Sequence, residues 1–215
     1  MNPTISVDNS ALVVPLDSAK QHCRSFSASD DPFVTDFIKL ATEVVEDMTQ
    51  RCCLNRTYVW KAPRFVSGAR GPTDDFWYAR YPFGDRPDPV LYLPIAPVVS
   101  ISSVTYVNTA GSITTVSPTT YVLDNASEPC RLGPTVNWPT DLSTSELMPV
   151  TVTFVAGYDA SDPTKVPFRL REAIKRLVAH YYENRGFFSE DPGMTLELPL
   201  GFVELISSLK VFRYA

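Results

Sequence analysis

The stretch 150-VTVTFVAGYDASDPTKVPFRLREAIKRLVAHYYENRG-186 predicts a strand, a short connection rich in turn residues, and then the most strongly patterned helix of the chain. Three large apolar residues, Val150, Val152 and Phe154, alternate with two threonines. This two-residue period is typical of a strand with one buried face. We therefore expect a strand over residues 150–155, with the helix after it.

The predicted helix has one apolar side and one charged side. Pro167 suits its first turn, where the missing N–H costs nothing, and Gly186 can adopt the left-handed conformation that ends a helix. The apolar residues recur at spacings of three and four, which places them on one stripe. This inward stripe is predicted to consist of Leu170, Ile174, Leu177, Val178 and Tyr181.

A short helix is predicted near the N-terminus, after a polar arm over residues 1–15. Asp17 or Ser18 can cap this helix, because Ser18 and Gln21 have the spacing of a capping box. The helix is expected to run to about Arg24.

A longer helix is predicted to follow. Asp30 and Asp31 precede Pro32, and carboxylates favour the positive end of a helix, where proline is also tolerated. Its inward stripe is predicted to consist of Phe33, Phe37, Leu40, Ala41, Val44 and Met48.

The middle of the chain changes to the two-residue period of strands. An antiparallel β unit is expected here, and residues 108–111 have the length and the glycine of a hairpin loop. Strands are predicted over residues 57–61, 90–93, 98–107, 113–116, 120–123 and 150–155.

Residues 63–89 are too long and irregular for a simple connection within this β unit. The aromatic side chains of this segment either fold back on the sheet or project to pack on another subunit or protein. The second interpretation rests on the preference for aromatic residues and arginine at interface centres. The candidate interface residues are Phe76, Trp77, Tyr78, Arg80, Tyr81 and Phe83.

The chain ends in a connection, a short helix and a tail. Residues 187–199 are rich in glycine, proline and acid, and residues 200–209 predict a final helix. The tail, residues 210–215, alternates basic or polar with apolar residues, a pattern suited to adding to a sheet edge or anchoring in a groove. A frayed terminus is the alternative.

The composition is that of a globular protein. Its 215 residues can bury a full core, and 44% of them are hydrophobic and 20% charged. A net charge of -5 argues against a surface built to neutralise nucleic-acid phosphates. No apolar run approaches the roughly 18 residues needed to span a bilayer, and no export signal is recognisable, so no membrane partner is predicted.

No metal, cofactor or catalytic residue is predicted. The four cysteines form no C-x-x-C pair and only two histidines accompany them, so reduced thiols are expected, with Cys52 and Cys53 at a helix end. G-x-S-x-G, H-E-x-x-H and Gly-rich phosphate motifs are absent from the sequence. Three acidic pairs could imitate a hydrolase site, but a helix cap, a solvated helix face and a loop explain them: Asp30/Asp31, Glu46/Asp47 and Asp74/Asp75. His180 is interpreted as a polar helix residue.

The order of these elements resembles the head-tail connector (head-completion adaptor) proteins of tailed bacteriophages. The motifs that carry the resemblance are Val155-Ala156-Gly157-Tyr158, Val166-Pro167 and the sequence from His180 to Arg185. It covers roughly residues 12–62 and 90–209. The family implies a bundle of about four helices, two N-terminal and two C-terminal, with an inserted antiparallel β unit. The corresponding divisions are an arm at 1–15, helices at 16–53, a β domain at 54–156 with its long loop at 63–89, helices at 157–209 and a tail at 210–215.

The resemblance also implies a structural virion protein of the neck, assembled in the host cytoplasm. Such proteins form a ring, typically of about twelve copies, beneath the portal protein. The ring extends the DNA channel and receives the stopper or tail proteins, and DNA passes through it without sequence-specific binding. The tail would then dock on the portal through Lys210, Val211, Phe212, Arg213 and Tyr214. The alternatives are another neck or tail-completion protein (stopper or terminator), a β-rich interaction module outside viruses and, less favoured, a hydrolase.

Overall fold

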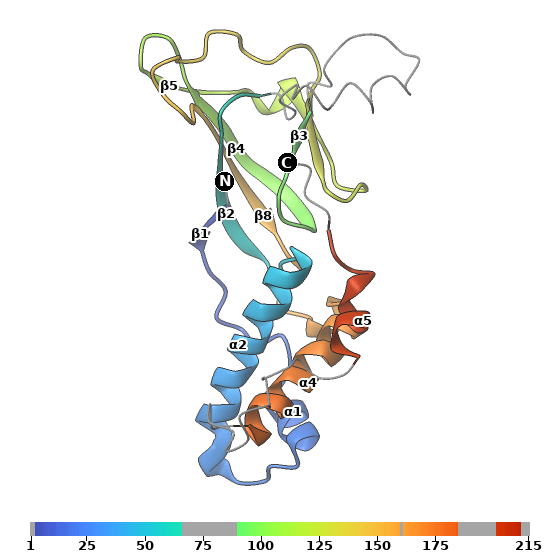
Figure 1. Ribbon diagram of the computed structural model, residues 1–215. Coiled ribbons are helices and arrows are strands. Elements are labelled where there is room, and N and C mark those ends of the chain that lie inside the picture. Colours follow the sequence, from blue (N-terminus) through green and yellow to red (C-terminus); the bar gives the residue numbers. More distant parts are fainter. Residues whose placement is uncertain (1–2, 66–89, 160, 185–200, 212–215) are drawn as a thin grey trace, which may run out of the picture. The chain divides into compact units, whose positions relative to one another are not determined.

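The computed structural model describes residues 3–65, 90–159, 161–184 and 201–211 (Figure 1). This part of the chain contains four α-helices and two antiparallel sheets. The predicted α+β class is therefore confirmed.

The chain forms two compact units. The helical unit comprises Asp8–Asn55 and the described residues of Gly157–Val211, and the β unit comprises the described residues of Met1–Val7 and Arg56–Ala156. Each unit is assembled from segments that are distant in the sequence. The chain crosses between them after Val7, Asn55 and Ala156.

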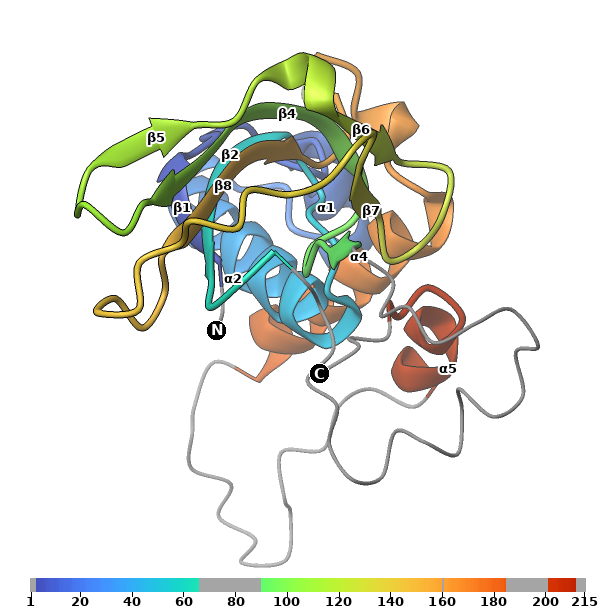
Figure 2. The same cartoon turned by 90° about the horizontal axis from the view of Figure 1, so that it is seen from above.

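Strand β8 lies in the middle of the main sheet of the β unit (Figure 2). Its buried residues are Val150, Val152, Phe154 and Ala156, which alternate with half-buried ones as the sequence predicts. All neighbouring strands are antiparallel. The order is β1 (Thr4–Val7), β2 (Arg56–Ala62), β8 (Val150–Ala156), β4 (Val98–Val107) and β5 (Ile113–Thr115).

A second sheet of three strands completes the β unit. Its order is β3 (Leu91–Tyr92), β7 (Arg131–Pro134) and β6 (Tyr121–Asp124), with a 3-10 turn, η2 (Pro118–Thr120), before β6. The sequence did not predict β7, because this strand ends in glycine and proline and lacks an alternating pattern.

Strand β1 lies inside the segment that was predicted to be an arm. Its register pairs Thr4 with Val59 and Ile5 with Tyr58 of β2. All four residues of β1 are exposed. Because neither face of the strand is buried, the backbone pairing leaves no hydrophobic period in the sequence.

The helical unit contains the four helices and two short 3-10 turns. The helices pack around α4, which contacts α1, α2 and α5. Their bounds are α1 (Leu16–Cys23), α2 (Asp31–Thr49), α4 (Phe168–Glu183) and α5 (Phe202–Ser207), and the turns are η1 (Ala28–Asp30) and η3 (Pro163–Lys165). The α4 stripe is as predicted, with Leu170, Ile174, Leu177 and Val178 fully buried and Tyr181 half-buried.

Helix α1 begins earlier than the predicted caps. Leu16 is its first residue, and no side chain caps it. The N–H of Ala19 donates instead to the carbonyl of Pro15 at 3.1 Å, so the first turn is closed by the backbone. The predicted capping roles of Asp17 and Ser18 are wrong.

The inward face of α2 is rotated by about one residue from the prediction. Its buried residues are Val34, Ile38, Ala41, Thr42, Val45 and Thr49, whereas Phe33 and Leu40 are exposed. The hydroxyls of Thr42 and Thr49 donate to the carbonyls of Ile38 and Val45, each at 2.7 Å. These internal bonds satisfy the polar groups, so the threonine side can be buried while larger apolar residues remain outside.

Candidate assembly surfaces

The two segments of the helical unit approach each other closely at Gly157. Its φ is +118°, and a Cβ at this position would lie 2.4 Å from the carbonyl oxygen of Leu54. The N–H of Asn55 donates to the carbonyl of Tyr158 at 2.8 Å, which holds the two segments at this close distance. The glycine of the Val-Ala-Gly-Tyr motif is therefore required by both its conformation and its surroundings.

Arg51 fixes the end of α5 to the end of α2. Its side chain is buried, and Nε donates to the carbonyl of Leu209 at 2.6 Å. One Nη of Arg51 also reaches the hydroxyl of Tyr158 at 3.4 Å. A cation thus satisfies a carbonyl at the C-terminal end of a helix, an arrangement that also suits the helix dipole. Arg51 could not be identified from the sequence, because its partners lie more than a hundred residues away.

The predicted portal-binding tail begins as part of the helical unit. Lys210 is exposed, but Val211 is only 4% exposed, and its N–H donates to the carbonyl of Thr49 at 2.9 Å. Val211 therefore anchors the tail to α2 and does not present its side chain to solvent. The other candidates, Phe212, Arg213 and Tyr214, lie outside the described residues.

An aromatic cluster holds the start of the long segment that was predicted to project. Phe65 is 3% exposed and stacks on Trp138 with ring centroids 4.6 Å apart. Tyr106 meets the edge of Phe65 at 5.8 Å, and Tyr121 lies 6.4 Å from Trp138. Phe65 therefore folds back on the β unit. The interface candidates Phe76, Trp77, Tyr78, Arg80, Tyr81 and Phe83 lie outside the described residues.

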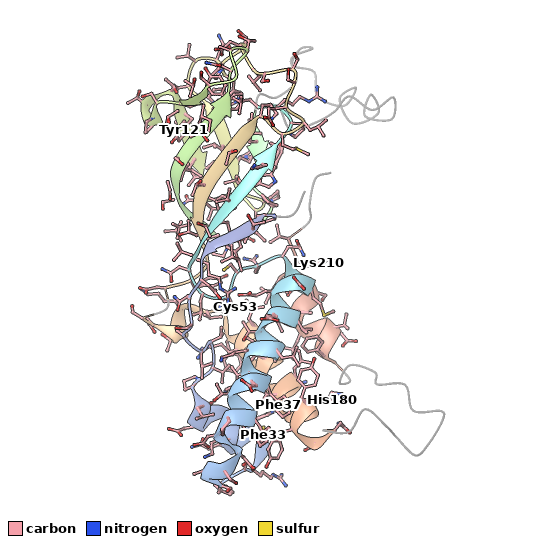
Figure 3. The ribbon with its side chains drawn as sticks, turned by 90° about the vertical axis from the view of Figure 1, so that its left-hand side faces the viewer. Phe33, Phe37, Cys53, Tyr121, His180 and Lys210 are labelled. Atoms are coloured by element: carbon pink, nitrogen blue, oxygen red, sulfur yellow. The ribbon has the colours of Figure 1, made fainter. Side chains whose placement is uncertain are left out.

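The flank of α2 beside its buried face carries an apolar stripe with an acidic border. Phe33 is 55% exposed and Leu40 is 45% exposed, and Phe37 and Val44 are half-buried on the same side. Phe37 also contacts the ring of Tyr181 on α4, 6.2 Å between centroids. Figure 3 shows Phe33 and Phe37 on α2 and His180 on α4 at the same end of the helical unit. The bordering acids, all exposed, are Asp36, Glu43 and Asp47.

A second apolar position with the opposite charge around it lies at the start of α4. Phe168 is 67% exposed, and the guanidinium of Arg171 lies 5.8 Å from its ring centroid. Arg169 is exposed and donates to the hydroxyl of Ser208 at 2.7 Å. Lys175 forms an ion pair with Glu172 at 2.9 Å. Around Phe168, cations outnumber carboxylates.

Three of the acids that could imitate an enzyme site, Asp30, Asp31 and Glu46, make structural bonds. Asp30 accepts from the hydroxyls of Ser25 and Tyr182, at 2.8 and 2.5 Å, and Asp31 pairs with Lys20. Glu46 accepts from the N–H of Cys53 at 2.6 Å. The described residues contain no group of three or more histidines, cysteines or acids able to hold a metal ion.

His180 and the four cysteines are the remaining candidate groups. His180 lies within 3.4 Å of the side chain of Asn184 and beside the ring of Tyr181. All four cysteines are thiols, and Cys52 and Cys53 lie just after the end of α2, as predicted. Burial raises the pKa of the Cys23 thiol, which disfavours the nucleophilic thiolate. In the described segments, no helix is long and apolar enough to cross a membrane.

The loop between β8 and α4 is fixed by a local charge cluster. Asp159 accepts from Nζ of Lys165 at 2.9 Å and from the hydroxyl of Ser161 at 2.7 Å. The hydrogen bond from Lys165, followed by those from Ser161, holds the pKa of the Asp159 carboxyl well below its usual range. This cluster orders the entry to α4 and has the composition of a surface turn.

No protein-family profile matches the chain, and no curated protein sequence matches it. Its fold is similar to solved chains of gene transfer agent (GTA) particles. A chain from the virion of the native particle has a TM-score of 0.70 at 20% identity, and the match covers 100% of this chain and 98% of the other. A chain from the neck of the empty particle, computed with C6 symmetry, has a TM-score of 0.69 at 22% identity, covering 100% and 96%. A chain from the neck of the native particle, computed with C12 symmetry, has a TM-score of 0.64 at 22% identity, covering 100% and 98%. The chain therefore has, over its whole length, the fold of a chain found in the virion and neck of a phage-like particle.

Proposed function

We propose that this chain is a structural protein of the neck of a phage-like particle, a head-tail connector that forms a ring beneath the portal. The observation that carries the proposal is the full-length similarity of fold to chains of GTA necks, one of them computed with C12 symmetry. The resemblance of the sequence to connector proteins leads independently to the same role. The ring would contain about twelve copies.

The surfaces of the described residues agree with an assembly role. Exposed apolar side chains surrounded by charges occur on α2 and at the start of α4, and such patches are typical of protein interfaces. Of the acidic pairs that are described, Asp30, Asp31 and Glu46 make internal hydrogen bonds or an ion pair, and Asp47 is exposed on the surface of α2.

A connector must let DNA pass without retaining it. The net charge of -5 suits such a channel, because every lysine or arginine that contacts a phosphate strengthens binding through counterion release. We propose that DNA passes through the lumen of the ring without sequence-specific contacts. The stopper or tail proteins would bind the ring on the side away from the portal.

The tail after Val211 is proposed to bind the portal. Because Val211 is buried against α2, a variant that ends at Val211 retains the anchor and removes only residues 212–215. We expect this variant to fold normally by circular dichroism and to lose co-sedimentation with portal rings. Unchanged binding to the portal would refute this role of the tail.

The test of the overall proposal is cryo-electron microscopy of necks isolated from particles that carry this chain. A ring of the chain between the portal and the next neck component is the expected result. Particles whose necks lack the chain, or in which it occupies the position of a stopper or tail terminator, would refute the connector assignment.

A further inference from the structure

Two surfaces of the helical unit are complementary in both apolar character and charge. The α2 stripe, defined here as Phe33, Phe37, Leu40 and Val44, has Phe33 and Leu40 exposed at 55% and 45%, whereas Phe37 and Val44 pack partly against the core of their own unit. It is bordered by three exposed carboxylates and one exposed ammonium, that of Lys39, which lies 3.9 Å from Asp36. The carboxylates are those of Asp36, Glu43 and Asp47.

The α4 patch, defined here as Phe168 with Arg169, Arg171 and Lys175, has the opposite balance. Its three cations are accompanied by one carboxylate, that of Glu172. Nε of Arg171 is buried and has no hydrogen-bond partner among the described residues. A rotation of the Arg171 side chain that brought Nε within hydrogen-bond distance of a carboxylate of another molecule would satisfy this donor.

The two surfaces lie on different helices of the unit, α2 and α4. Along α2, Asp31 points in the same direction as the buried Thr49 and pairs with Lys20 of α1, whereas Leu40 points about 180° away from Asp31. The stripe therefore faces away from α1. Along α4, Phe168 falls on the side opposite the buried Leu170 and Ile174. A molecule that used both surfaces would bind one neighbour through each.

We infer that the α2 stripe of one copy of this chain binds the α4 patch of the next copy, so that the contact is head-to-tail. Such a heterologous contact closes into a ring when the rotation between neighbours is a whole fraction of a turn. The inference rests on the proposed connector function and identifies the surfaces that hold the ring together. Apolar contact between Leu40 and Phe168 would form its centre, and the opposed charges would set its orientation.

The test uses two variants of the full chain, Leu40→Glu and Phe168→Glu, each of which removes one of the two surfaces. Native mass spectrometry at a chain concentration of about 0.5 mM measures the size of the assemblies. We expect oligomers for the wild-type chain and monomers for each variant alone. The 1:1 mixture of the variants retains one intact stripe and one intact patch, so it should form heterodimers that grow no further. Ile113→Glu, at a 77% exposed apolar residue of the β unit, is the control and should assemble like the wild-type chain.

A charge exchange tests the borders of the same contact. Asp36→Arg with Asp47→Arg should lower the oligomer fraction at least tenfold, and adding Arg169→Glu with Arg171→Glu in the same chain should restore it. A variant that merely misfolded would not be rescued by further substitutions on another helix. Thermal unfolding of each variant shows whether the fold is retained.

Several outcomes would overturn the inference. A wild-type chain that stays monomeric at this concentration would do so, as would dimers of Phe168→Glu alone, which would mean that stripes bind stripes. Loss of thermal stability in Leu40→Glu without a change in assembly would show that the stripe is covered within its own chain. The proposed function fails separately: a neck ring held by other surfaces would overturn only this inference, whereas necks without the chain would overturn the connector role.

Discussion

Replacing Gly157 with alanine should destabilise the helical unit far more than the same change at Gly201. A non-glycine residue forced to a φ of +118° costs about 1–3 kcal/mol. The new methyl group would also lie 2.4 Å from the carbonyl oxygen of Leu54 and 2.7 Å from the N of Asn55, where ordinary contacts are 3.4–4 Å. Separating the backbones by the missing distance would break the hydrogen bond between Asn55 and Tyr158, worth about 1 kcal/mol net. We expect a total loss of at least about 3 kcal/mol, a large part of the roughly 5–15 kcal/mol that stabilises a typical domain.

Gly201→Ala is the matched control, because it lies in the same unit and has a φ of +76°. The nearest atoms to its new methyl group would be side-chain atoms at 3.8 and 3.9 Å, so only the conformational cost of about 1–2 kcal/mol remains. Urea unfolding followed by the helical circular dichroism signal reports on this unit, which contains the four described helices. If the two variants lost stability equally, within about 0.5 kcal/mol, the close approach of Gly157 to Leu54 would have no energetic role and the reasoning would be refuted.

Three further perturbations test contacts described above. Arg51→Met should lower the free energy of unfolding of the helical unit by about 2–3 kcal/mol, because it removes a charge-assisted hydrogen bond to the Leu209 carbonyl. Urea titration measures this loss, and an unchanged free energy of unfolding would show that water replaces the bond. Phe65→Ala should cost the β unit about 3–5 kcal/mol through the lost stacking on Trp138, seen as a fall in the midpoint of thermal unfolding, whereas Ile113→Ala at an exposed site should have almost no effect. Asp159 has a lowered carboxyl pKa in the folded state, so it stabilises the fold above its unfolded pKa of about 3.9, and this contribution is lost as the pH falls below that value. Asp159→Asn should therefore be less stable than the wild-type chain at pH 7, and the difference should shrink in acid. A difference in stability that did not change with pH would contradict the ion pair with Lys165.

The sequence predicted those elements in which burial and periodicity coincide. Val150, Val152 and Phe154 are buried on one face of β8, and Leu170, Ile174 and Leu177 are buried on one face of α4, so the two- and three-to-four-residue periods identified both elements. The prediction for α2, which carries two adjacent apolar stripes, was only partly right, because Ala41 is buried but Phe33 and Leu40 are exposed. Size and hydrophobicity favour the Phe33–Leu40 side, but the hydroxyls of buried threonines are satisfied within the helix, and this is not visible in a hydrophobic pattern.

Contacts between distant residues could not be predicted from one sequence. The stacking of Phe65 on Trp138 and the bond from Arg51 to Leu209 join positions at no characteristic spacing. Strand β1 was missed because its four side chains are all exposed. Of the assembly surfaces, the α2 stripe was recognised as apolar but assigned to the core, and the α4 patch was recognised only as part of a charged helix surface. The sequence shows which residues of α2 are apolar and which are acidic. The packing of α4 and α5 against α2 decides which side of the helix is exposed to solvent.

The anchoring of Val211 determines how a pull on the C-terminus would be resisted. Tension applied to the residues after Val211 acts first on the hydrogen bond from Val211 to Thr49, at the last residue of α2, and next on the bond from Arg51 to Leu209. These two bonds hold the ends of α2 and α5 together, so a pull that breaks the first bond exposes the buried Val211 and passes the load to the second bond. A partner that held the tail would therefore pull on a point that two hydrogen bonds secure. Substitution of Arg51 would remove one of them, because its side chain donates that bond, whereas the bond between Val211 and Thr49 joins backbone atoms and does not depend on the Thr49 side chain.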